Sequence, residues 1–185
     1  RPSTAQVAFD GLEGGAWYFL WAGDDFRNVE GGPRFQIGPM LRVGRRWNVG
    51  VKGLYGTFDR QFQLDPVEGT ELGVELFLRY SFADPAEDHF FVQLMGGFSQ
   101  LDSDIVGEGE VVIDSYSQNG WTLGPEVGFG FAASRFLDVV AAAGATLNSY
   151  ADSRIFGPDD ATTGSSVSPI RFGFRVGLVF GRKDL

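Results

Sequence analysis

LGVELFLRYSF, residues 72–82, has a large apolar side chain at every second position over its whole length. One face of an extended strand would carry Leu72, Val74, Leu76, Leu78, Tyr80 and Phe82, and the other Gly73, Glu75, Phe77, Arg79 and Ser81. A period of two residues is the geometry of a β-strand. The stretch is longer than the usual soluble strand of about five or six residues, and it suits a strand that crosses a membrane at a tilt.

The same alternation predicts seven further strands. We expect the eight strands at residues 15–22, 34–43, 47–57, 72–82, 90–98, 121–131, 137–147 and 170–180. The first of these is aromatic throughout, so its pattern does not indicate which face points where. The chain has 185 residues and no shift in composition. We therefore predict one all-β domain spanning residues 1–185.

The connections between these strands alternate between long and short. The long ones are 23–33, 58–71, 101–120 and 148–168, and the short ones are 44–46, 83–88 and 133–135. This regularity predicts an eight-stranded antiparallel up-and-down transmembrane β-barrel with short periplasmic turns and long extracellular loops. Both termini would then lie on the periplasmic side.

The composition excludes several other classes of protein. A net charge of −9 disfavours a nucleic-acid partner, because nucleic-acid recognition needs a basic face. The chain has no cysteine, which rules out disulfides and thiolate metal sites. It also lacks a run of about 18 apolar residues, so no transmembrane helix is predicted. The first residues contain neither Met nor a signal-peptide core, and we expect an export signal to have been removed.

The non-apolar face of the predicted strands combines many glycines with a few large charged side chains. Such a mixture suits the crowded interior of an eight-stranded barrel, so we predict that the apolar face meets lipid. The predicted interior charge network comprises Arg34, Arg42, Lys52, Glu75, Arg79, Glu126, Asp138, Arg171 and Arg175. An isolated buried charge costs several kcal/mol, so these groups should pair and plug the lumen, with basic groups in modest excess.

Aromatic residues stand near both ends of the predicted strands. The short-turn ends carry Trp47, Tyr80, Phe82, Phe90 and Phe180, and the long-loop ends carry Tyr55, Phe98 and Trp121. Two aromatic girdles at the membrane interfaces are typical of membrane barrels. We therefore predict interfacial positions for these side chains.

From residue 14 to residue 180 the chain resembles the small eight-stranded bacterial outer-membrane barrels, such as the OmpA transmembrane domain, OmpX, OmpW and the opacity proteins. Its most specific feature is the last strand, IRFGFRVGLVF at 170–180. This strand resembles the C-terminal assembly signal of the family, through Phe172, Phe174, Val176, Leu178 and Phe180. The family pattern ends on Phe, whereas here residues 181–185 follow it.

The resemblance implies an integral outer-membrane location. It also implies contact with outer-membrane lipid and lipopolysaccharide, and with the barrel-assembly machinery during insertion. The family includes adhesins, membrane-to-wall tethers and barrels without a known role. The resemblance therefore does not name a surface partner.

His89 is the only histidine in the chain and follows the turn at 83–88. Lipid A-modifying relatives use a His with a Ser, but no nucleophilic Ser accompanies His89 on this turn. We interpret His89 as a solvated turn residue and predict no enzyme activity, no cofactor and no metal site. Gly128 and Gly130 lie inside a predicted strand, where packing explains them better than phosphate binding.

The predicted long loops are acidic. They contain Asp24, Asp25, Glu30, Asp65, Glu68, Glu71, Asp102, Asp104, Glu108, Glu110, Asp114, Asp152, Asp159 and Asp160. Residues 102–110 do not have the spacing of a calcium loop, and we interpret the carboxylates as solvated. The leading hypothesis is a structural or surface-interaction barrel that uses these loops for envelope organisation, adhesion or partner binding. The alternatives are a narrow channel, a soluble lipocalin-like ligand-binding barrel and a lipid A-modifying enzyme.

Overall fold

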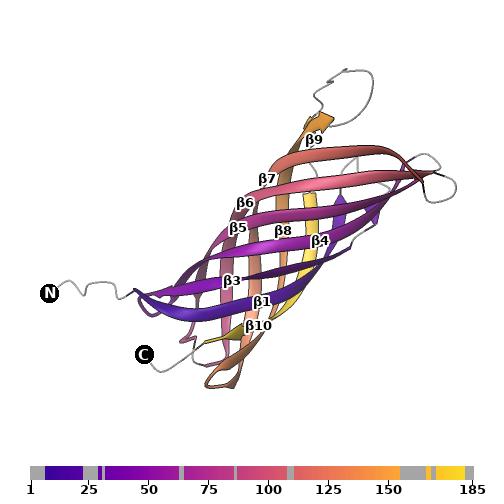
Figure 1. Ribbon diagram of the computed structural model, residues 1–185. Helices are drawn as coiled ribbons and strands as arrows, with labels where there is room; N and C mark the ends of the chain where they lie inside the picture. The colour runs from indigo at the N-terminus through magenta and orange to yellow at the C-terminus, as the bar shows by residue number, and fades with distance from the viewer. Residues whose placement is uncertain are drawn as a thin grey trace.

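The computed structural model is a closed barrel of antiparallel strands (Figure 1). It describes residues 7–22, 29–30, 32–62, 65–85, 87–107, 111–154, 166–167 and 170–181. The barrel strands are β1 (Val7–Ala22), β3 (Pro33–Val43), β4 (Trp47–Phe62), β5 (Asp65–Ser81), β6 (His89–Gly107), β7 (Val111–Ser134), β8 (Leu137–Arg154) and β10 (Ile170–Phe180). Two short strands, β2 (Val29–Glu30) and β9 (Ser166–Val167), pair with β4 and β8.

Each barrel strand pairs with the barrel strand before and after it in the chain, and β10 closes the sheet against β1 and β8. Closure leaves no free sheet edge along the barrel wall and satisfies the backbone polar groups within the wall. The prediction of an eight-stranded all-β barrel is confirmed. The described residues include no helix that is both long and apolar enough to span a bilayer.

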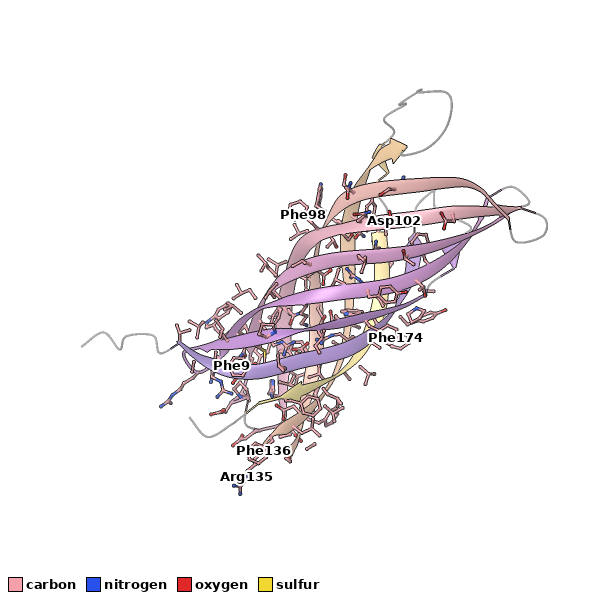
Figure 2. All side chains as sticks on the ribbon, viewed as in Figure 1. Phe9, Phe98, Asp102, Arg135, Phe136 and Phe174 are labelled. Atoms are coloured by element: carbon pink, nitrogen blue, oxygen red, sulfur yellow. The ribbon has the colours of Figure 1, made fainter. Side chains whose placement is uncertain are left out.

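One end of the barrel carries the tight turns, and we call it the short-turn end. It contains the turns at 44–46, 82–88 and 135–136, the start of β1 and the end of β10. Gly44 has a φ of 68°, a left-handed conformation that glycine adopts without steric cost. The turn residues Arg135 and Phe136 mark this end in Figure 2, and Asp102 lies toward the opposite, long-hairpin end.

The connections at the long-hairpin end are extended β-ladders for much of their length, where the sequence predicted loops. The β4–β5 ladder continues until Phe62 faces Asp65, and the β6–β7 ladder until Gly107 faces Val111. The apolar alternation stops well before these pairs, but ladder hydrogen bonds need only backbone groups. The predicted loops at 58–71 and 101–120 are therefore wrong for most of their residues, and most of 23–33 and 148–168 lies outside the described residues.

The first strand begins at Val7 and not at residue 15, and it contains a β-bulge. Phe9 faces Leu41 while Gly11 faces the adjacent Met40, so Asp10 is an extra residue on β1. Gly11 has a φ of 154°, and a Cβ atom there would collide with the carbonyl of Phe180. A bulge interrupts the period of two, so the alternation does not extend back to the start of this strand.

The apolar face of the barrel points outward. Leu76 and Val176 are 65% and 57% exposed, whereas the adjacent Glu75 and Arg175 are each 1% exposed. Figure 2 labels the exposed Phe9, Phe98 and Phe174, which lie on different strands of the wall. The barrel therefore has the inside-out polarity predicted from the glycine-rich polar face.

Two glycines on neighbouring strands provide a test of the close packing of the wall. A Cβ atom on inward-facing Gly38 would collide with the carbonyl of Val51, whereas one on outward-facing Gly53 meets nothing nearer than 3.9 Å. We expect Gly38→Val to lower the free energy of unfolding by about 1–3 kcal/mol, through overpacking. Gly53→Val is the matched control and should leave it unchanged. Urea titration of the refolded proteins in detergent measures the unfolding free energy of each variant. Equal stability of the two variants would contradict the close packing of the wall at Gly38.

Candidate functional site

The interior of the barrel is organised around one carboxylate, that of Glu13 on β1. Glu13 is 0% exposed and accepts hydrogen bonds from Lys52 Nζ on β4 and Arg79 Nη2 on β5, both at 2.6 Å. It also forms an ion pair with Arg175 on β10. Three cations from three strands therefore converge on a single acidic group, in the charge-assisted contacts that are the strongest hydrogen bonds in proteins.

Two further contacts extend this arrangement to the remaining side of the lumen. Arg175 Nη2 lies 2.5 Å from Glu126 Oε1 on β7, and Arg79 Nε donates to Gln93 Oε1 on β6 at 2.9 Å. We call Glu13, Lys52, Arg79, Glu126 and Arg175 the central cluster. Its side chains and Gln93 link six of the barrel strands across the lumen.

Aromatic rings fill the space between these cations. Lys52 Nζ lies 4.4 Å from the ring centre of Phe77, and the Arg79 guanidinium lies 4.3 Å from that of Phe91. The Arg175 guanidinium lies 5.8 Å from the ring centre of Trp17. These distances permit cation–π attraction, so the rings both occupy volume and stabilise the buried charge.

A second group of charges, the upper cluster, lies nearer the long-hairpin end and comprises Arg34, Glu71, Glu75, Tyr150 and Arg171. Arg171 Nη1 donates to both Glu71 carboxylate oxygens at 2.9 and 3.0 Å. Arg34 lies 2.9 Å from Glu75 and 3.4 Å from Glu71, and Arg171 also donates to the Tyr150 hydroxyl. Two carboxylates thus neutralise two guanidinium groups.

A third group lies toward the short-turn end. Asp10, the extra residue of the β1 bulge, pairs with Arg42 Nη2 at 2.5 Å and accepts from Asn48 Nδ2 at 2.7 Å. His89 is close by and lines the same small cavity as Asp10, Arg42 and Asp138. The bulge therefore supplies the carboxylate that neutralises Arg42.

His89 is buried, contrary to the prediction of a solvated turn residue. It is 7% exposed, its Nδ1 lies 2.8 Å from the carbonyl oxygen of Glu87, and its ring packs against Gly130. The difference arises because His89 is the first inward-facing residue of β6 and not part of the turn. The described side chains include no group of three or more His, Asp or Glu residues able to hold a metal ion.

Two small cavities lie between these groups. The cavity beside His89 measures about 20 Å³, and a second one, lined by Arg34, Glu71 and Arg171, measures about 10 Å³. A single water needs about 10–15 Å³. Each of these two cavities therefore has room for about one water molecule.

The structure brings the predicted interior charges together inside the barrel. Arg34, Arg42, Lys52, Glu75, Arg79, Glu126, Asp138, Arg171 and Arg175 all face inward. Sequence reasoning missed Asp10, Glu13 and Tyr150, and it assigned Glu71 to a solvated loop although Glu71 is 4% exposed. With these residues the described interior carries six acidic and six basic groups, so the predicted excess of basic charge is wrong.

The predicted interfacial aromatics lie on the outer surface. Trp47, Tyr55, Phe82, Phe90, Trp121 and Phe180 are exposed. Tyr80 is half-buried between Trp47 and Phe82, at ring-centre distances of 4.9 and 5.3 Å. In the predicted assembly signal, Phe172, Phe174, Val176, Leu178 and Phe180 all point outward. Their interfacial and assembly roles stay predictions.

Most of the predicted acidic loop residues fall outside the described side chains. These are Asp24, Asp25, Glu30, Asp65, Glu68, Glu108, Glu110, Asp114, Asp152, Asp159 and Asp160. Asp102 and Asp104 belong to β6, and Asp102 accepts a hydrogen bond from Gln100 at 2.9 Å. Asp102 and Asp104 therefore lie on a β-ladder and not on a loop.

Three solved structures are similar to the whole barrel. Neisserial surface protein A (NspA) shares 11% identity at a TM-score of 0.61, with 95% of this chain and 99% of that chain covered. The outer membrane protein OprG from Pseudomonas aeruginosa shares 12% identity at a TM-score of 0.57, with 95% and 97% covered. A major outer membrane protein from Thermus thermophilus shares 12% identity at a TM-score of 0.53, with 92% and 98% covered.

At these identities the likeness concerns the fold. The chain has the fold of the small eight-stranded outer-membrane barrels. No protein-family model matches the chain, and no curated protein matches its sequence.

The convergence of three cations on Glu13 gives a stability prediction. Among the described residues, Glu13 is the only carboxylate that pairs with both Lys52 and Arg79, so for Glu13→Gln we expect a loss of about 3–5 kcal/mol in unfolding free energy. Glu75→Gln is the matched control, because Arg34 keeps Glu71 as a partner, and its loss should be smaller. Urea unfolding in detergent compares the two. A Glu13→Gln variant as stable as Glu75→Gln would contradict the central role of Glu13.

Proposed function

We propose that this protein is an integral outer-membrane β-barrel with a structural or surface-interaction role, whose interior is plugged by its own charges. In this proposal both termini lie on the periplasmic side, and the long hairpins point outward from the cell. The proposal rests on one observation. Large apolar side chains cover the outside of the barrel while paired charges occupy its inside.

The outer surface supports a membrane environment. Soluble monomers rarely expose a continuous apolar patch larger than a few hundred Å². Here apolar residues face outward on every barrel strand, with Phe98 at 74%, Phe90 at 65% and Ile37 at 65% exposure. Hydrocarbon is the solvent that such a surface fits. The similar solved structures are themselves described as a surface protein and as outer membrane proteins.

The long hairpins support a role in surface interaction. The β6–β7 ladder continues far beyond the apolar band, to the pair Gly107 and Val111. The polar side chains of Gln100, Asp102 and Ser117 are joined by hydrogen bonds on this ladder. A hydrogen-bonded hairpin presents side chains in fixed positions, as a binding or adhesion surface requires. We propose that partners bind there and that the barrel serves as their anchor, without catalysis.

Site-directed spin labelling tests the membrane orientation. Labels on Leu76→Cys and Val176→Cys, in protein reconstituted into lipid vesicles, should collide often with oxygen and rarely with a water-soluble nickel chelate. The physical reason is that oxygen partitions into hydrocarbon and the chelate does not. Arg135→Cys, on an exposed turn, is the control and should show the opposite preference.

Two outcomes would contradict the membrane assignment. One is contact of the Leu76 and Val176 labels with the nickel chelate. The other is a purified protein that stays folded and monodisperse without detergent, which is the behaviour expected of a soluble ligand-binding barrel. Heat-dependent migration in detergent gels supplies an independent check of the folded barrel.

Single-channel recording distinguishes the plugged barrel from a narrow channel. We expect no steady openings from the wild type in planar bilayers, because side chains fill an interior of this width. Phe77→Ala and Phe91→Ala remove rings that pack against the central cations and should increase the frequency of openings. Phe98→Ala, on the outer face, is the matched control and should behave like the wild type. Steady, large wild-type openings would favour the channel.

A further inference from the structure

A long apolar groove lies on the outer surface of the barrel. It crosses β10, β1, β3, β4 and β5 and has a volume of about 890 Å³. Gly14 and Gly53 form its floor, and Phe35, Tyr55 and Leu72 are among the residues along its sides.

A second groove continues the first toward the long-hairpin end. It has a volume of about 570 Å³, crosses β5 to β8 and shares Leu72, Gly73, Val74 and Gln100 with the first. The exposed rings of Phe98 and Trp121 line it, together with polar side chains of three strands. Gln100, Asn119 and Ser149 are its accessible polar residues, whereas Ser99 and Tyr150, which also line it, are buried. The combined groove is thus apolar along most of its length and polar at one end.

The strand register explains why the groove runs in this direction. One row of cross-strand partners follows it, in the order Gly14, Ile37, Gly53, Val74, Phe98, Trp121 and Ser149. Barrel strands tilt, so such a row climbs along the barrel axis. Gly53 is six positions after Trp47, the first residue of β4, whereas Ser149 is twelve positions after Leu137, the first residue of β8. The groove therefore rises from within the apolar band to its polar edge.

The two floor glycines are not required by the packing of the wall. A Cβ atom on Gly14 would lie 3.8 Å from the nearest atom, and one on Gly53 would lie 3.9 Å from it, both ordinary contact distances. Larger side chains would fit at both positions and would fill the groove. The glycines therefore shape the outer surface and do not relieve crowding inside the wall.

We propose that this groove binds a glycolipid, with one acyl chain on the Gly14 and Gly53 floor and an uncharged, hydroxyl-rich headgroup at the polar end. Amide and hydroxyl side chains at that end match sugar hydroxyls, and Trp121 offers an aromatic face beside them. Among the described residues that line either groove there is no Lys or Arg, so a phosphate would find no cation. The inference rests on the membrane location proposed above.

The test measures quenching of Trp121 fluorescence in vesicles that contain the reconstituted barrel. Two brominated lipids with the same acyl chains are compared at equal mole fraction, a glucosyl diacylglycerol and a phosphatidylcholine. The emission of Trp121 is taken as the difference between the wild type and Trp121→Phe. We expect the glucosyl lipid to bind about fivefold better, the effect of one net headgroup hydrogen bond.

Variants separate the two ends of the groove. Gly14→Leu with Gly53→Leu fills the apolar floor and should abolish the excess quenching, whereas Ala143→Leu, exposed on β8 outside the groove, should keep it. Asn119→Leu should remove the preference for the sugar headgroup. Equal quenching by the two lipids in the wild type, or the same result from the floor variant and Ala143→Leu, would overturn the proposal.

The outcomes also distinguish this inference from the proposed function. A barrel that inserts into the vesicles but quenches equally with both lipids contradicts the glycolipid site alone. A barrel that does not insert, and stays folded in buffer, contradicts both.

Discussion

Charges inside a barrel of this width have to neutralise one another, because side chains fill such an interior and leave little room for water to solvate them. Glu13 is the shared partner of three cations, and it lies on the strand that begins the barrel. The cations that pair with Glu13 also make the next contacts in the lumen. Arg175, held by Glu13, also reaches Glu126, and Arg79 also reaches Gln93. Closure of the sheet and neutralisation of its interior therefore depend on each other.

The large interior side chains have a counterpart in the glycines paired with them on the adjacent strands. A Cβ atom on Gly50 would strike the ring of Phe77, and one on Gly128 would strike the ring of Phe91. These rings lie beside Lys52 and Arg79. Small and large inward-facing residues are thus paired on neighbouring strands, which suits a small barrel because side chains of uniform size would not fill a tapering interior.

The sequence predicted the wall of the barrel better than its charge network. Alternation depends on which side chains point outward from the barrel, so strands such as 34–43 and 170–180 could be placed to within a residue. The alternation cannot indicate strand structure where a strand extends beyond the apolar band, and Glu71 was assigned to a loop for that reason. Glu13 was missed because the predicted first strand began after it. Which carboxylate meets which cation depends on strands distant in the sequence, and no local pattern encodes that.

The bulge at Asp10 determines which side chains at the start of the first strand point inward. Asp10 and Glu13 are separated by an odd number of positions, so in a regular strand they would face opposite sides of the sheet. The extra residue turns both of them inward. Without the bulge, the same residues in regular alternation would place Phe9 in the lumen and the Asp10 carboxylate on the outer wall. A single backbone irregularity thus allows one continuous strand to serve two separate charge clusters.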